Sequence, residues 1–179
     1  MTSKENVLIA VVAAAGETGL DRVQLQKSMF LAGEEFGGYL PSDFYQFRPY
    51  MYGPFSQEIY SDVERLSDGL AVETFTDERG RASYRLPHEA SAGLSSLSDD
   101  LESGIRRIVA WVQSMPFDEL VRAIYFLYPE QQRNSVFPDY SDEKAQEESF
   151  LRGFAEIAAG GGRPALDLAD ELFAETVDG

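Results

Sequence analysis

The sequence contains no cysteine, one histidine and only three lysines among its 179 residues. Without cysteine there can be no disulfide, no thiol nucleophile and no cysteine-ligated zinc or iron–sulfur centre. The single histidine, His88, cannot build a multi-histidine metal site, and no motif of a hydrolytic triad surrounds it. We therefore expect no catalytic residues, no metal and no cofactor, and we predict that the chain is not an enzyme.

Long apolar runs are also scarce. The apolar run at residues 7–15 is too short to span a bilayer. Lys4 precedes it but is offset by Glu5, so the positive start of a signal peptide is not evident. We predict a cytoplasmic protein that does not contact membranes, with this run as a buried first helix.

Positively charged residues are also few compared with negatively charged ones. The 15 Lys and Arg residues face 31 Asp and Glu residues, which gives a formal net charge of -16. This charge disfavours nonspecific coating of DNA and favours a basic protein partner. A salt-rich host would produce the same acidity without any bearing on partners. Hydrophobic residues make up 44% of the chain, which is enough for a packed core.

Apolar spacing and turn residues divide the first 90 residues into helix, helix, strand, helix and hairpin. The second helix has a buried stripe of Leu25, Met29, Ala32 and Phe36, and Gln26 and Lys27 are expected to lie off this stripe. The predicted elements are a helix at 6–15, a helix that follows Asp21 and stops at 37–38, a strand at 44–48, a turn at 52–54, a helix between Ser56 and Gly69, and strands at 71–76 and 81–86.

Local signals support these boundaries. Asp21 and Ser56 are suitable N-cap residues, and Phe55 with Tyr60 matches a hydrophobic staple across the second of these caps. Gly69 stands where a left-handed residue often ends a helix. In the hairpin, Phe75 and Tyr84 are expected to face each other as a cross-strand pair.

The second half of the chain is predicted to be helical. The apolar spacing indicates helices at 94–115, with a mild interruption at Gly104, and at 118–128. Two further helices are expected at 141–159 and from Pro164 to about 176, joined by three glycines. The fold class predicted is α+β and mostly helical, with a winged helix-turn-helix-like domain at 1–90 and a helical extension at 91–179.

The predicted third helix and the hairpin tip carry the candidate nucleic-acid contacts, because Gln and Ser can read base edges and Arg can bind guanine or phosphate. Four carboxylates share this helix, so a solvated face with no DNA contact is the alternative. The candidate DNA-binding residues are Gln57, Ser61, Arg65, Arg79 and Arg81.

The long helix after residue 94 carries a candidate interface for a dimer or a protein partner. Packing by the later helices of the same chain would cover it equally well. The candidate interface residues are Leu101, Ile105, Ile108, Trp111 and Val112. A second group could stack on bases or on a partner chain, or else form the core under a long loop; it comprises Tyr39, Tyr45, Tyr50, Tyr52 and Tyr60.

Three segments together carry a family resemblance. They are Leu25-Gln26-Lys27-Ser28-Met29-Phe30-Leu31-Ala32, then Phe47-Arg48-Pro49-Tyr50-Met51-Tyr52-Gly53-Pro54-Phe55-Ser56 leading to Ile59-Tyr60, and Tyr128-Pro129-Glu130 with Asn134-Ser135. Over residues 5–136 the chain resembles the YwgA-like family of prokaryotic proteins and, more distantly, Panacea (SocA-like) antitoxin domains. Ser28 departs from the aliphatic residue expected there. The resemblance implies a winged-helix-like fold and a role in regulation or mobile-element conflict, and it implies no catalytic residue.

Two hypotheses for function follow. In the first, the chain is a non-enzymatic winged-helix regulator or adaptor that contacts DNA through the third helix and the hairpin tip. In the second, it is a protein-interaction module, antitoxin-like or a subunit of a defence complex, whose acidic surface binds a basic partner. A homodimer through the long helix is compatible with either hypothesis.

Overall fold

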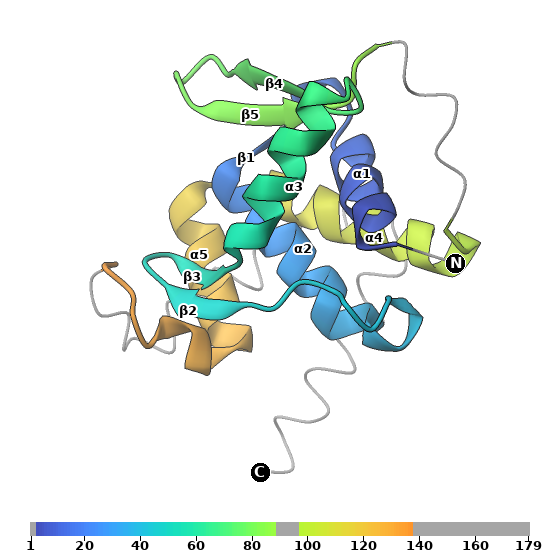
Figure 1. Cartoon of the computed structure of the whole chain (residues 1–179). Helices are drawn as coiled ribbons and strands as arrows, with labels where there is room; N and C mark the ends of the chain where they lie inside the picture. The colour runs from blue at the N-terminus through green and yellow to red at the C-terminus, as the bar shows by residue number, and fades with distance from the viewer. Residues whose placement is uncertain (1–2, 89–96, 138–179) are drawn as a thin grey trace.

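The computed structural model describes residues 3–88 and 97–137, which form an α+β fold with two small antiparallel sheets (Figure 1). The helices are α1 (Lys4–Ala14), α2 (Arg22–Phe36), α3 (Gln57–Asp68), α4 (Asp99–Ser114) and α5 (Phe117–Leu127), and the strands are β1 (Leu20–Asp21), β2 (Arg48–Tyr50), β3 (Gly53–Phe55), β4 (Glu73–Thr76) and β5 (Ala82–Arg85). Short 3₁₀ turns cover Gly16–Thr18, Gly37–Tyr39 and Pro129–Gln132. No helix in these described ranges has the length and apolar character needed to cross a membrane.

The first two helices are present close to their predicted bounds, although α1 begins at Lys4, two residues before the predicted start. Ser3 caps α1 by accepting a hydrogen bond from the Asn6 amide, and the apolar residues of this helix are buried nearly all round. At the start of α2, Asp21 accepts from the Val23 and Gln24 amides, and the Gln24 side chain accepts from the Asp21 amide. This reciprocal capping satisfies donors that the first helical turn leaves unpaired. The cap predicted at Asp21 is therefore confirmed.

A three-stranded sheet in the order β1-β5-β4 packs at one end of the helices. The predicted hairpin is present, but its register differs from the expected one by one residue. Thr74 faces Tyr84 and Phe75 faces Ser83, because the five residues after Thr76 form the loop and the Asp77 amide donates to the Arg81 carbonyl. A shift of one residue moves a side chain to the other face of a sheet. The predicted pair of Phe75 and Tyr84 is therefore wrong.

The strand predicted at 44–48 is also wrong in position. The pairing begins only at Arg48, in the hairpin of β2 and β3, where Arg48 faces Phe55. Tyr45 is instead buried against α3, where its hydroxyl donates to the Asp62 carboxylate at 2.7 Å. The aromatic composition of this segment reflects burial in the core, which strand propensity alone cannot distinguish from sheet pairing.

Helix α3 ends at Asp68 as predicted, but the left-handed residue after it comes one position later than expected. Gly69 has φ -80°, and the left-handed residue is Leu70 with φ 58°. The Ala71 amide donates to the Leu66 carbonyl and the Leu70 amide to the Ser67 carbonyl, which is the Schellman pattern with Leu70 after the cap. Gly69, which was predicted to be the left-handed residue, is thus the C-cap of α3.

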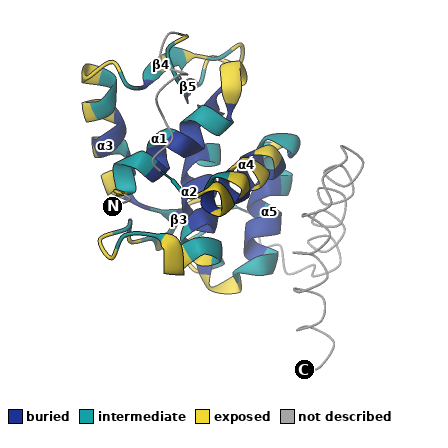
Figure 2. Cartoon of the chain, turned by 90° about the vertical axis from the view of Figure 1, so that its right-hand side faces the viewer, coloured by how far each residue is buried: buried dark blue, intermediate teal, exposed yellow. Residues whose placement is uncertain are grey.

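Helices α4 and α5 complete the core. Residues of α4 pack with α1 in one buried cluster, and residues of α5 pack with α2 in a second. Figure 2 shows that α4 turns a buried side to these helices and an exposed side outward. The predicted boundary at residue 90, the first residues of the helix predicted at 94–115, and the helices predicted at 141–159 and after Pro164 lie outside the described residues.

Candidate functional site

The exposed face of α3 and the tip of the β4–β5 hairpin carry the residues predicted to contact DNA. Gln57, Ser61 and Arg65 are exposed along α3. Arg79 and Arg81 lie in the loop of the β4–β5 hairpin, and Figure 1 places this hairpin at the opposite end of α3 from the β2–β3 hairpin. The structure thus separates the candidates into a helix group and a hairpin group.

Arg65 is occupied by carboxylates of its own chain. Its guanidinium contacts the carboxylates of Asp62 at 2.6 Å and Glu5 at 2.8 Å. The hydrogen bond to Asp62, followed by that to Glu5, raises the pKa of Arg65 above its usual value. Since Glu5 belongs to α1, this arginine links α3 to α1, and much of its charge is compensated before any phosphate approaches.

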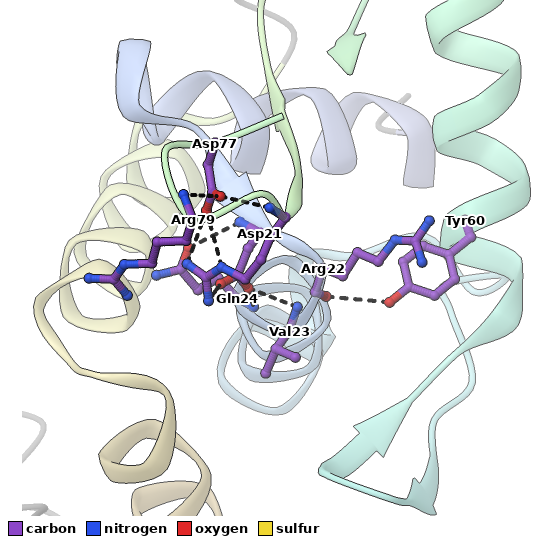
Figure 3. Close-up of polar contacts among 8 residues, drawn as sticks. Asp21, Arg22, Val23, Gln24, Tyr60, Asp77 and Arg79 are labelled. Carbon is purple, nitrogen blue, oxygen red and sulfur yellow. Dashed lines mark hydrogen bonds and ion pairs between the residues drawn. The ribbon is translucent and has the colours of Figure 1, made fainter. Parts of the chain in front are cut away.

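Arg81 is occupied in the same way. It contacts the carboxylates of Asp21 at 2.7 Å and Asp77 at 3.1 Å. Asp77 also accepts from the backbone amides of Arg79 and Arg81, and the amide of Arg81 is the largest cause of its lowered pKa. These contacts join the hairpin tip to the N-terminus of α2 (Figure 3). The Arg79 side chain points away from this cluster and forms no ion pair with a described residue.

Carboxylates dominate the remainder of the α3 surface. Glu58, Glu64 and Asp68 are exposed there, and among these three only Glu58 has a described cationic partner, Lys4. A phosphate backbone laid along this helix would meet more negative than positive charge. The solvated acidic face that the sequence offered as the alternative therefore fits the geometry of α3 better than a groove-binding helix.

The residues predicted as a dimer or partner interface lie inside the chain. Each has an exposed fraction of 8% or less, because α4 turns this side toward the other helices of the same chain. They are core residues, and this part of the prediction is corrected. The residues are Leu101, Ile105, Ile108, Trp111 and Val112.

Gln26 and Lys27, predicted to lie off the buried stripe of α2, are both buried, with exposed fractions of 2%. The Gln26 amide pairs with the backbone of Ser56 in both directions: Nε2 donates to the Ser56 carbonyl, and the Ser56 amide donates to Oε1, each at 2.9 Å. The Gln26 side chain thus forms the pair of hydrogen bonds with the Ser56 backbone that a neighbouring strand would form in a sheet. The Ser56 side chain makes no capping hydrogen bond, so the position of the predicted cap is right and its mechanism is different.

Lys27 lies under the β2–β3 hairpin. Its ammonium group donates to the Pro54 carbonyl at 3.2 Å, and burial lowers its pKa to about 7. Gly53 has φ 93°, and a Cβ at this position would lie 3.3 Å from the Tyr125 ring and 3.5 Å from the Lys27 side chain. The hairpin backbone therefore approaches α2 and α5 closely at this glycine.

The segment after α5 covers the outer side of the same hairpin. The Asn134 side chain donates to the Pro49 carbonyl at 3.0 Å, and the Val136 amide donates to the Met51 carbonyl at 3.0 Å. Ser135 joins the two sides, since it accepts from the Tyr125 hydroxyl and donates to the Met51 carbonyl. The segments 25–32, 47–60 and 128–135 thus meet around the β2–β3 hairpin.

No local sequence pattern indicates the pairing of arginines with rings beside this hairpin. The Arg22 guanidinium lies 5.6 Å from the centre of the Tyr60 ring, and the Arg48 guanidinium lies 5.8 Å from the Tyr50 ring and 6.0 Å from the Phe55 ring. Both arginines were available in the sequence, but only the fold brings Arg22 against Tyr60, which is 38 positions away.

Among residues 3–88 and 97–137, no three His, Asp or Glu side chains gather in a way that would hold a metal ion. No protein-family model, no curated protein and no solved structure matches the chain.

Proposed function

We propose that the chain is a non-enzymatic protein-interaction module with a winged-helix-like domain, and that the acidic face of α3 binds a basic partner protein. The observation that carries the proposal is the compensation of Arg65 and Arg81, each of which contacts two carboxylates of its own chain. With these arginine charges compensated and Glu58 paired with Lys4, the exposed Glu64 and Asp68 determine the sign of the surface.

The winged-helix part of this proposal rests on topology. The order α1, β1, α2, α3, β4, β5 and the sheet order β1-β5-β4 are those expected for a helix-turn-helix with one wing. The β2–β3 hairpin lies where a short turn usually joins the second and third helices. In this interpretation α3 is the recognition helix and the β4–β5 hairpin is the wing.

The test is purification of the tagged full chain from its host with and without nuclease, followed by binding measurements with the purified partner. We expect a stoichiometric protein that survives nuclease and carries a surplus of lysine and arginine. The double variant Glu64→Gln, Asp68→Asn removes two exposed charges that have no described ion pair, and it should weaken binding about 3- to 10-fold. The loss should shrink as salt rises.

The matched control is Asp99→Asn, Asp100→Asn, which removes two exposed charges from α4 and should leave binding unchanged. Equal weakening by both double variants would show that only net charge matters and would contradict a binding face on α3. Recovery of specific DNA fragments that disappear with nuclease, with no retained protein, would replace the proposal by the DNA-binding one.

Duplex DNA is the second candidate partner, favoured by Arg79, the hairpin-tip arginine without an ion pair to a described residue. If the wing binds DNA, Arg79→Ala should weaken binding at all sequences and reduce the slope of log affinity against log salt by about 1. Arg107→Ala is the control, because Arg107 is exposed on α4 and likewise has no described ion pair. Fluorescence anisotropy with labelled duplexes measures both. Indistinguishable affinities for the two variants would reject DNA contact by the wing.

A further inference from the structure

Five side chains form a continuous exposed or half-buried row across the start of α2, the start of α3 and the β2–β3 hairpin. We call this row the arginine–aromatic strip. The Tyr60 and Phe55 rings meet edge to face at 5.7 Å, and the Phe55 and Tyr50 rings lie 4.9 Å apart. Arg22 covers Tyr60 at one end of the row, and Arg48 covers Tyr50 and Phe55 at the other. Figure 3 shows the Arg22 guanidinium against the Tyr60 ring.

The two arginines of the strip differ from most others in the described residues. Arg65, Arg81, Arg85, Arg106 and Arg122 each form an ion pair with a carboxylate of the chain. Arg22 and Arg48 form none with any described carboxylate. The Tyr84 hydroxyl lies next to Arg22. Glu64 attracts Arg22 electrostatically but forms no ion pair with it. Arg79 and Arg107 likewise have no ion pair with a described residue, but Arg22 and Arg48 lie at the two ends of one row of aromatic rings. In a chain with net charge -16, this arrangement of positive charge and rings indicates a ligand-binding surface.

The geometry of these arginines specifies the ligand chemistry. A guanidinium that lies within about 6 Å of a ring centre is attracted to the ring face, and without a carboxylate partner it keeps N–H donors for a ligand. Such donors match the two oxygens of a carboxylate. Next to Arg48 lies a surface hollow of about 370 Å³, lined by Arg48, Pro49, Tyr50, Met51, Asn134 and Val136. Tyr50, Met51 and Val136 have exposed fractions of 40%, 42% and 59%, so the hollow can accept an apolar side chain.

The chain also holds this surface in place from within. Buried Gln26 and Lys27 bond to the backbone of Ser56 and Pro54, and Asn134 bonds to the Pro49 carbonyl on the other side. Buried polar side chains are costly unless fully paired. These side chains lie under a hairpin whose two strands have only three residues each. Because so short a hairpin adds little to the core, their hydrogen bonds indicate that the orientation of the hairpin has a role besides stability.

We propose that the arginine–aromatic strip is a docking surface for an acidic peptide segment of a partner protein. Carboxylates of the peptide contact Arg22 and Arg48, and an apolar side chain enters the hollow beside Tyr50. The proposal rests on the proposed function in that the ligand is a protein. It adds a second, positively charged contact surface to the acidic face of α3. A polynucleotide fits less well, because its charges continue past the strip toward Glu58 and Glu64 of α3.

The test uses the immobilised full chain and a phage library of random twelve-residue peptides. We expect enrichment of peptides with two or more Asp or Glu residues around an apolar one. Synthetic versions should lose at least 10-fold in affinity when Gln and Asn replace the acidic residues. The variant Arg22→Lys, Arg48→Lys keeps the charge but removes the planar donors, and it should also lose about 10-fold. Arg107→Lys is the matched control and should bind as the wild type does.

Three results would overturn the proposal. One is enrichment of basic peptides alone, which would instead support the acidic face of α3 and so separates this proposal from the function above. Another is unchanged binding of the acidic peptides to both the Arg22→Lys, Arg48→Lys variant and Tyr50→Ala, with the wild-type thermal midpoint retained. The third is displacement of the acidic peptides by a ten-nucleotide oligo-dT at lower concentration than by the unlabelled peptide, which would assign the strip to single-stranded nucleic acid.

Discussion

Replacing Lys27 by methionine is expected to remove most of the rise in unfolding free energy between about pH 7 and pH 9.5. Burial lowers the pKa of Lys27 from 10.5 to about 7 in the folded chain. Between these two values the unfolded chain binds a proton that the folded chain does not, so the free energy of unfolding increases with pH. At about 1.4 kcal/mol per pH unit, the contribution over this range is about 3 kcal/mol.

The measurement is urea unfolding of both proteins at several pH values in this range. Methionine matches the length of the lysine stem and carries no proton, so the difference in free energy between wild type and variant should change steadily with pH. The variant also leaves the Pro54 carbonyl without its donor, which costs about 1–3 kcal/mol at every pH and does not alter the slope.

Lys4→Met is the matched control for this prediction. Lys4 is half-buried, and its hydrogen bond with Glu58 raises its pKa. A group with a raised pKa contributes its full stability below its unfolded value of 10.5, so this contribution is constant from pH 7 to 9.5. Lys4→Met should shift the whole curve without changing its slope. Parallel curves for wild type and Lys27→Met would show that Lys27 does not titrate near pH 7.

Replacing Gly104 by alanine should destabilise the chain by about 1–3 kcal/mol, although alanine is the better helix former by about 1 kcal/mol. Gly104 lies in the middle of α4, directly against the end of the Phe36 ring of α2. A Cβ at this position would lie 2.0 Å from Cζ of Phe36 and under 3 Å from two further ring atoms. Either the ring or the helix must move, and the contact between α2 and α4 loosens.

The physical cause is tested by a double-mutant cycle with Phe36→Ala, followed by thermal or urea unfolding. With the ring removed, Gly104→Ala should stabilise the chain by about 0.5–1 kcal/mol, so the effect of one substitution changes sign. Ser103→Ala, at an exposed position one residue earlier, should change stability by less than about 0.5 kcal/mol. A destabilisation that persists in the Phe36→Ala background would attribute the effect to something other than this contact.

Much of the candidate site could not be predicted, and the reason differs from residue to residue. The exposure of Gln57, Ser61 and Arg65 follows from helical spacing once Ile59 and Val63 are recognised as core residues. The compensation of Arg65 depends on Glu5, which lies 60 positions away, and no local pattern indicates that contact. The buried interface candidates on α4 show the same limit, because an apolar stripe indicates that something covers it but not which chain does so.

Local sequence by itself determined the N-cap of α2 and, to within two residues, the start of α1. The capping box of Asp21 and Gln24 and the cap at Ser3 act over three residues, so these contacts can be recognised without knowledge of the fold. The staple of Phe55 and Tyr60 is of the same kind, and its rings meet as expected.

Only the tertiary structure decided which polar side chains are buried and which arginines have no ion pair within the described ranges 3–88 and 97–137. Gln26 reaches Ser56 across 30 positions and Lys27 reaches Pro54 across 27. Periodicity alone placed both residues off the buried stripe, because it describes one helix face and carries no information on what packs against the others. Hydrogen bonds and ion pairs act over a few ångströms in space, so their partners are known only once the chain has folded.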